Sequence, residues 1–284
     1  MPPVRVVTDT VADLPASLLK ELHITTLPIY VQLGNEMFRD THDLTVEQFY
    51  EKLRHSRTMP TTSVPSPAIF AETYDKLAEE TDQILVITVT SRLSSVHEFA
   101  QKAVSLMKRS CRVEVLDSRW AIMAQGFIVL RAARAARSGA KLAEVIEEAK
   151  RQRERVHLRA AFDTLEYLKR GGRVGKAQAL IGSLLNINPV IGMKDGEVVP
   201  LGRERSRSKA LDNIFNFVSG FACVEELAVE HAAAAADATS LLARLRRRFP
   251  GQTIYESHTS PVIGTHTGPS LVCAAVLGDL APAA

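Results

Sequence analysis

The stretch Ile84-Leu-Val-Ile-Thr-Val-Thr90, followed by Ser91-Arg-Leu-Ser-Ser95, indicates the fold of the first half of the chain. Its β-branched residues form a short apolar run that ends in polar residues, which is typical of a buried strand. Similar runs occupy residues 4–7 and 112–116, and amphipathic stretches such as 46–54 and 68–80 separate the three. This alternation predicts an α/β first half, in which helices cover a parallel sheet.

Polar side chains follow each of these predicted strands. They are Thr8-Asp-Thr10 after the first, Ser91–Ser95 after the second and Asp117-Ser118 after the third. In open α/β sheets, ligands bind at the carboxyl ends of the strands. A helix predicted from about residue 96 to 107 begins directly after Ser94 and Ser95, so its first N–H groups point into the same crevice. We therefore expect an anion-binding crevice at this edge.

The second half has a different order of elements. Helices predicted at 120–137 and 141–155 lead into it, and we place the domain boundary near residue 155, which gives domains 1–155 and 156–284. The predicted elements that follow are a strand at 156–162, helices at 164–169 and 176–184, a hairpin around Lys194-Asp-Gly196, helices at 207–218 and 237–248, and strands at 224–230, 253–257 and 270–276. The pattern predicts a mixed α/β (α+β) second domain, with the ligand site between the two domains.

Composition limits the classes of function. The chain has 284 residues, of which 46% are hydrophobic, and its net charge of +3 reflects 35 Lys and Arg residues against 32 Asp and Glu residues. This balance does not call for a nucleic acid or an anionic membrane as partner. The three cysteines lie far apart and form no C-x-x-C pair, which favours a reducing compartment. With no apolar run long enough to cross a bilayer and no signal-peptide core, we expect a soluble, cytoplasmic protein.

Two hydroxyl-rich or basic segments are candidates for binding an anion. Prolines restrict the chain around the hydroxyls of Pro60-Thr-Thr-Ser-Val-Pro-Ser-Pro67, where the same hydroxyls could instead cap a helix starting near Pro67. Glycines form a tight bend in the segment Asp163-Thr-Leu-Glu-Tyr-Leu-Lys-Arg-Gly-Gly-Arg-Val-Gly-Lys176, where Arg170 and Arg173 add positive charge. A solvated surface role is the alternative for both arginines.

A third candidate is His266 in Val262-Ile-Gly-Thr-His-Thr-Gly-Pro269. Gly264 and Gly268 enclose it, which predicts a tight loop that presents the imidazole ring, although a lone histidine is more often structural. If the ring were protonated, it would add positive charge, and anion affinity would then depend on pH near the histidine pKa.

Together with Thr8-Asp-Thr10, these segments resemble the DegV family of bacterial fatty acid binding proteins over nearly the whole chain. The resemblance implies a fatty acid carrier without a cofactor, which holds the ligand's carboxylate with Thr61, Thr62, Ser94, Arg170 and His266. It further implies that a separate ATP-dependent fatty acid kinase takes the ligand from the carrier and makes an acyl-phosphate for phospholipid synthesis, with Arg173 facing this partner. Transient membrane contact is left open. The chain departs from the family pattern at Ser95, where glycine is usual, and at Val96-His97, where Thr-Tyr is usual.

Two other classes of function remain as alternatives. A serine-dependent lipid or ester hydrolase could use Ser94 or Ser118 with His266 and an acid such as Asp9 or Asp117, but the chain has no G-x-S-x-G elbow. A regulatory nucleic-acid binder could use the basic runs at 203–207 and 244–248, although no aromatic platform accompanies them. The chain also lacks the P-loop motif of nucleotide-binding proteins.

Overall fold

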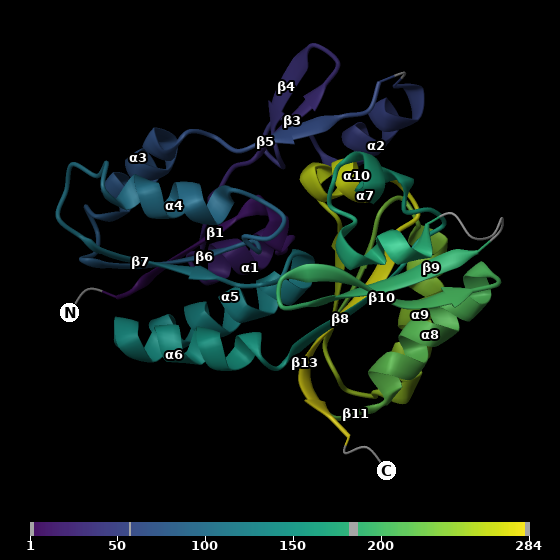
Figure 1. Cartoon of the computed structure of the whole chain (residues 1–284). Helices are drawn as coiled ribbons and strands as arrows, with labels where there is room; N and C mark the ends of the chain where they lie inside the picture. Colours follow the sequence, from purple (N-terminus) through teal and green to yellow (C-terminus); the bar gives the residue numbers. More distant parts are fainter. Residues whose placement is uncertain (1–2, 57, 182–186, 282–284) are drawn as a thin grey trace.

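The computed structural model describes residues 3–56, 58–181 and 187–281, and the strands in these ranges form three sheets (Figure 1). The first is a parallel sheet of four strands, in the order β2, β1, β6, β7. Its strands are β1 (Arg5–Asp9), β2 (Thr25–Leu27), β6 (Gln83–Thr88) and β7 (Arg112–Asp117). The helices of this half are α1 (Ala16–Glu21), α2 (Val46–His55), α3 (Pro67–Leu77), α4 (Val96–Val104), α5 (Ile122–Arg137) and α6 (Leu142–Arg153), with a 3₁₀ helix, η1 (Thr10–Ala12).

Strand β6 shows why the apolar run at 84–90 is nearly continuous. Ile84 and Val86 pack into the core that contains residues of α3 and α4, whereas Leu85 and Ile87 pack into the core that contains residues of α5 and α6. Successive side chains of a strand point to opposite faces, so a sheet covered on both faces needs apolar residues at every position. The predicted α/β first half is confirmed. The order of the strands reverses between β1 and β6, which is where such sheets bind ligands.

A small antiparallel sheet, which the sequence pattern did not predict, joins β4 (Glu36–Arg39), β3 (Tyr30–Leu33) and β5 (Thr61–Ser63). Strand β5 is part of the hydroxyl-rich segment between prolines, residues 60–67. Thr62 pairs with Val31, so this hydroxyl is held by a strand ladder. The rigidity expected from the prolines therefore comes from the sheet.

The second half is built on a mixed sheet of six strands, which confirms the predicted class. The order is β10, β9, β8, β13, β11, β12, and only β11 and β12 run parallel. The strands are β8 (Val156–Ala161), β9 (Asn188–Lys194), β10 (Glu197–Glu204), β11 (Phe221–His231), β12 (Ile254–His258) and β13 (Val272–Leu280). The helices are α7 (Glu166–Arg170), η2 (Gly175–Leu180), α8 (Arg207–Ser219), α9 (Ala235–Arg248) and α10 (Pro261–Thr267). Asp195 and Gly196 have φ angles of 51° and 82°, as the predicted hairpin requires.

The two faces of this sheet have different neighbours. One face packs on α8 and α9, as Val190 and Ala274 illustrate. The opposite face packs toward the first half: Ala160 and Ile191 share a core with α3 and α4, and Ala275 shares one with α5. The two halves thus have continuous apolar contacts, while the boundary near residue 155 stays a prediction.

Two predicted elements differ from the structure. The helix expected at 176–184 is the short 3₁₀ helix η2, and residues 182–184 of that prediction lie outside the described residues. The prediction of a loop at 264–269 was wrong for its first part, because residues 261–267 form helix α10. Ser260 caps this helix by accepting from the backbone N–H of Ile263, and Pro261 occupies its first position, which is a common helix start.

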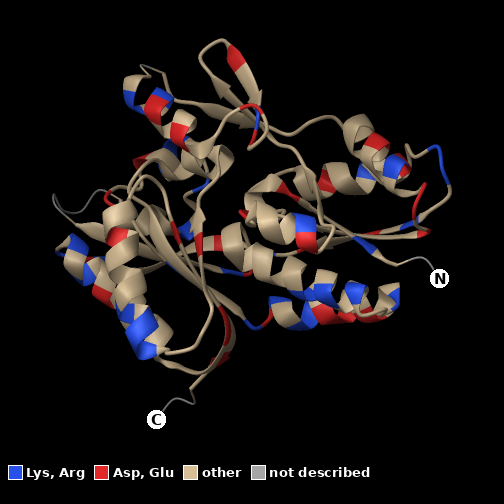
Figure 2. Cartoon of the chain, turned by 180° about the vertical axis from the view of Figure 1, so that it is seen from behind, with Lys and Arg blue, Asp and Glu red and all other residues tan. Residues whose placement is uncertain are grey.

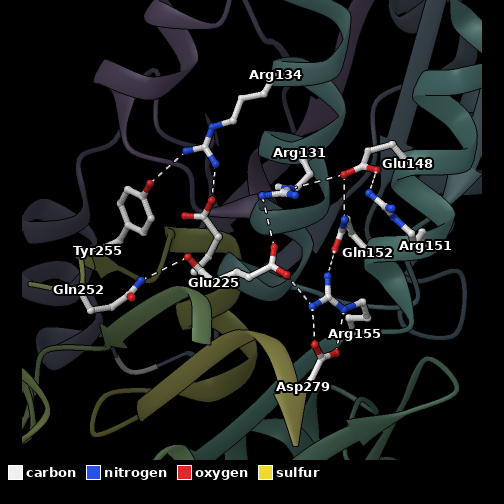
Figure 3. A network of polar contacts seen from close by, with 11 residues as sticks. Arg131, Arg134, Glu148, Arg151, Gln152, Arg155, Glu225, Gln252, Tyr255 and Asp279 are labelled. Atoms are coloured by element: carbon white, nitrogen blue, oxygen red, sulfur yellow. Dashed lines mark hydrogen bonds and ion pairs between the residues drawn. The ribbon is translucent and has the colours of Figure 1, made fainter. Parts of the chain in front are cut away.

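A network of ion pairs joins the halves next to the predicted boundary (Figure 3). Arg155 donates from both Nε and Nη2 to Asp279 on β13, at 2.9 and 2.8 Å, and from Nη2 to Glu225 on β11 at 2.5 Å. On α5, Arg134 pairs with Glu226 on β11. Arg155 is half-buried, so these bonds are screened less than pairs in open solvent. They stabilise the packing of the helices α5 and α6 on the second sheet.

Charges on the outer helices are mixed in sign (Figure 2). In the basic run at 244–248, Arg244 pairs with Asp212 on α8 and lies over the ring of Phe215, with its Cζ atom 4.4 Å from the ring centroid. On α6, Lys150 pairs with Glu147. This is the arrangement of a solvated helix surface. None of the helices within the described ranges is long and apolar enough to cross a membrane.

Candidate functional site: an apolar cavity with a polar cluster

A cavity of about 360 Å³ lies between the two halves. Val11, Val89 and Phe99 line it from the first half, and Ala160 and Ile191 line it from the second sheet. Val89 directly follows β6, and Val11 lies in η1, which follows β1, so the cavity lies at the carboxyl ends of the parallel strands, as predicted. Most of its wall is apolar, and its size falls within the range of small-molecule sites.

Four polar residues, Thr62, Ser94, Arg173 and His266, lie in the wall of this cavity, and we call them the polar cluster. Thr62 Oγ1 and His266 Nε2 lie 2.8 Å apart, at hydrogen-bond distance. Arg173 donates from Nε to the carbonyl of Leu93, the neighbour of Ser94, at 3.1 Å. The cluster therefore combines segments that are separated by more than 200 residues, since Thr62 and His266 are 204 positions apart.

Arg173 is held in place by two backbone carbonyls. Besides the bond to Leu93, its Nη1 donates to the carbonyl of Gly171 at 2.6 Å. Both acceptors are neutral, so the positive charge of the half-buried guanidinium is not paired with an acid among the described residues. A guanidinium in this state is suited to binding a carboxylate.

The glycine bend at residues 171 and 172 makes room for the His266 ring. A β-carbon on Gly171 would lie 2.5 Å from His266 Nδ1, so the ring packs directly on the backbone at this position. At Gly268 the φ angle is 67°, and a β-carbon there would lie 2.3 Å from the ring of Tyr167 on α7. Both glycines allow α7 and α10 to pack closely, which places His266 in the cavity wall.

His266 is half-buried, and this loss of solvation, followed by repulsion from Arg173, lowers its pKa to about 4. The ring is therefore neutral at pH 7, in contrast to the protonated form considered from the sequence. Its Nδ1 has no hydrogen-bond partner in the described part of the chain. A neutral ring with one nitrogen bonded to Thr62 can orient this hydroxyl toward a ligand.

This pKa predicts an effect of pH on stability. The pKa in the folded state lies below the ordinary value of 6.5, so the stabilisation from the neutral ring is fully present above pH 6.5 and is lost as the pH falls toward 4. Between pH 7.5 and 5.5 the unchanged protein should lose about 1 kcal/mol of unfolding free energy relative to His266→Gln, which does not titrate. Urea unfolding of both proteins at the two pH values measures this difference. A difference that does not change with pH would show that His266 is not buried in its neutral form.

Ser94 and Ser95 both line the cavity, and Ser95 precedes α4. Ser94 Oγ accepts weakly from the N–H of Val96 at 3.4 Å, so its hydroxyl hydrogen is available to a ligand. Ser63 belongs to the hydroxyl segment identified in the sequence but was not among the expected carboxylate contacts, and it also lines the cavity. It lies in the same hydroxyl run as Thr62, and this run was the signal that could have identified it.

Two expected residues are not part of the cavity wall. Thr61 is exposed at the start of β5, while Thr62 lies in the wall. Arg170 is exposed and donates from Nε to Glu166 at 2.7 Å, one helical turn earlier in α7. The chain turns after α7, at Gly171 and Gly172, and this turn brings Arg173 to the cavity in place of Arg170. Arg173, expected to face a partner, thus lies in the cavity wall.

The residues of the hydrolase alternative are engaged elsewhere. Ser118 Oγ donates to the carbonyl of Trp120, and Asp117 accepts from Ser91 Oγ at 2.6 Å. Asp9 accepts from the backbone N–H groups of Val11 and Val89. Within the described residues, His266 bonds neither Ser94 nor Ser118. The serine-to-histidine bond on which that chemistry depends is therefore not formed in this structure.

Comparisons with known proteins agree on one family. A family model described as an uncharacterised protein of the DegV family matches residues 3–279. A DegV domain-containing protein of Streptomyces coelicolor is 37% identical over 95% of this chain and 96% of its own length. Protein DegV of Bacillus subtilis is 31% identical over 93% and 95%.

Solved structures give the same result. A DegV family protein from Thermus thermophilus, described by its fatty acid binding, superposes with a TM-score of 0.89 at 32% identity and covers 97% of this chain and 99% of that one. DegV from Bacillus subtilis, described as a fatty acid binding protein, gives a TM-score of 0.90 at 29% identity over 98% and 100%. From the family model, the identities and the shared fold, it follows that this chain belongs to the DegV family.

Proposed function

We propose that this protein is a cytoplasmic carrier of long-chain fatty acids, which binds the acyl chain in the apolar cavity and the carboxylate at the polar cluster. The observation that supports this most strongly is the guanidinium of Arg173, which has no acidic partner among the described residues, beside the Thr62 and His266 pair in a mostly apolar wall. Relatives described as fatty acid binding proteins support the class of ligand.

The two parts of the ligand need different environments. Each buried methylene of the acyl chain contributes about 0.8 kcal/mol, which favours a long chain in an apolar cavity. A buried carboxylate is tolerated only where hydrogen bonds and an opposite charge replace water. In our proposal Arg173 supplies the charge, and the hydroxyls of Thr62 and Ser94 supply further donors. Arg173 thus takes the role that the sequence resemblance gave to Arg170.

The proposal is tested by titrating delipidated protein with oleic acid in a calorimeter, and by incubating the same protein with a long-chain p-nitrophenyl ester. We expect saturable binding of one oleic acid per chain and no ester turnover above that of buffer. Turnover that disappears in Ser94→Ala would instead favour the hydrolase.

We further propose that the carrier delivers its ligand to a separate ATP-dependent fatty acid kinase, which forms the acyl-phosphate. Support for this step comes from the sequence motifs that resemble the family. The test is to add the loaded protein and ATP to an extract of its own cells and to measure acyl-phosphate as its hydroxamate. Acyl-phosphate that forms equally well without the protein would contradict the delivery step.

A glycine substitution should separate the role of His266 from general stability. Gly171 has a φ angle of −72°, so alanine fits the backbone there, but its β-carbon would displace the His266 ring. We expect Gly171→Ala to weaken oleic acid binding about tenfold, the equivalent of one hydrogen bond to a charged group.

The matched control is Gly172→Ala, where φ is 70° and no atom lies within 4 Å of the added carbon. This control should cost about 1 kcal/mol of stability and leave the affinity unchanged. Equal affinities in both variants would show that the His266 ring does not contribute to binding.

A further inference from the structure

Helix α10, which carries His266, begins at two buried carboxylates from the first half. Asp13 Oδ1 accepts from the N–H of Ser260 at 3.2 Å, and Asp40 Oδ1 accepts from the N–H of Val262 at 3.3 Å. Asp13 is 8% exposed and Asp40 is 0% exposed. Neither residue belongs to the cavity wall.

These bonds complete the hydrogen bonding of the first turn. Pro261 has no N–H group, while Ile263 donates to Ser260 Oγ at 3.5 Å and Gly264 donates to the carbonyl of Ser260 at 2.8 Å. The N–H of Val262 would otherwise be a buried donor without a partner, which is costly. Asp40 therefore fixes where the helix begins.

Close packing further along α10 also restricts the position of this helix. A β-carbon at Gly264 would lie 2.5 Å from the ring of Phe49 on α2, so the helix has little room to shift. His266 lies one helical turn beyond Val262, and its ring must reach Thr62 at 2.8 Å. A displacement of the first turn is therefore transmitted to the imidazole.

We propose that Asp13 and Asp40 are positioning residues of the polar cluster, which fix the first turn of α10 and thereby hold the His266 ring at Thr62. This inference rests on the proposed function, because it assigns how the same site is held in its binding geometry. It assigns no ligand contact to either acid.

The test compares oleic acid with oleyl alcohol, which has the same chain but no carboxylate, in competition for a fluorescent fatty acid. Asp40→Ala removes the acceptor of Val262, and we expect it to weaken oleic acid binding about tenfold, because a displaced His266 ring no longer orients the Thr62 hydroxyl toward the carboxylate. Binding of oleyl alcohol should change less than about twofold, because the apolar wall supplies its affinity.

A conservative variant and an exposed variant of a neighbouring acid make the result specific. Burial raises the pKa of Asp40 to about 7. Asparagine keeps an acceptor oxygen at the Oδ1 position, whether or not the aspartate is charged. Asp40→Asn should therefore bind the acid as the unchanged protein does. Asp43→Ala removes an exposed carboxylate that pairs with Arg39, and it should leave both affinities unchanged. If Asp40→Ala does not fold, Asp40→Ser, whose shorter hydroxyl does not reach Val262, replaces it.

Ring resonances of ¹⁵N-labelled His266 provide a second readout. They should shift in Asp40→Ala and Asp13→Ala and stay unchanged in Asp43→Ala. Equal losses for acid and alcohol, or an unshifted ring, would overturn the positioning role. Failure of the unchanged protein to prefer the acid over the alcohol would instead contradict the proposed function, so the two failures are distinguishable.

Discussion

Arg173→Gln is expected to bind oleic acid about 100-fold more weakly than the unchanged protein. Breaking a buried, hydrogen-bonded charge pair costs about 2–5 kcal/mol, because the remaining charge stays buried without its partner. Glutamine keeps donors and much of the length of arginine but loses the charge. Arg173→Lys should show a smaller loss, since lysine keeps the charge without the planar fork.

The chain offers a matched control three residues away. Arg170→Gln is the same chemical change at an exposed arginine that pairs with Glu166, and it should alter affinity less than about twofold, because exposed ion pairs contribute little. Isothermal titration with oleic acid measures both variants. A larger loss in Arg170→Gln than in Arg173→Gln would show that the carboxylate binds where the sequence resemblance first indicated.

Ala160→Phe is expected to weaken oleic acid binding more than about 100-fold while the fold is retained. Ala160 lies on β8 in the wall of the cavity, so an aromatic ring at this position points into the space proposed for the acyl chain. Excluding about four methylenes removes roughly 3 kcal/mol of hydrophobic free energy. The cavity itself provides room for the ring, which limits strain in the surrounding core.

Chain length makes this second prediction specific. A twelve-carbon acid should lose less affinity than an eighteen-carbon acid in Ala160→Phe, because a shorter chain leaves more of the cavity empty. Competition against a fluorescent fatty acid measures the series, and circular dichroism checks the fold. Equal losses for all chain lengths would place the acyl chain elsewhere.

Three strands of the parallel sheet, β1, β6 and β7, could be predicted from sequence because local apolar runs indicate them, whereas the short edge strand β2 was not predicted. The small sheet could not, since its strands are only three or four residues long and β5 pairs with β3 across about 30 intervening positions. Nothing local in Thr61-Thr-Ser63 indicates such a partner.

The polar cluster could be predicted only in part. Thr62, Ser94 and His266 lie in motifs that the sequence identified, and the structure brings them to one cavity. The choice between Arg170 and Arg173 depends on the turn at Gly172, where φ is 70°; the paired glycines indicated a bend, but not which arginine the bend directs to the cavity. At Gly264, close packing against Phe49 explains a glycine that was interpreted as loop flexibility.

Native mass spectrometry of the protein purified from cells without detergent tests the fatty acid site most directly. We predict a complex heavier than the bare chain by one long-chain fatty acid, which is absent when Ala160→Phe is purified in the same way. A bare mass for the unchanged protein, together with no uptake of oleic acid by that sample, would contradict the proposed fatty acid carrier.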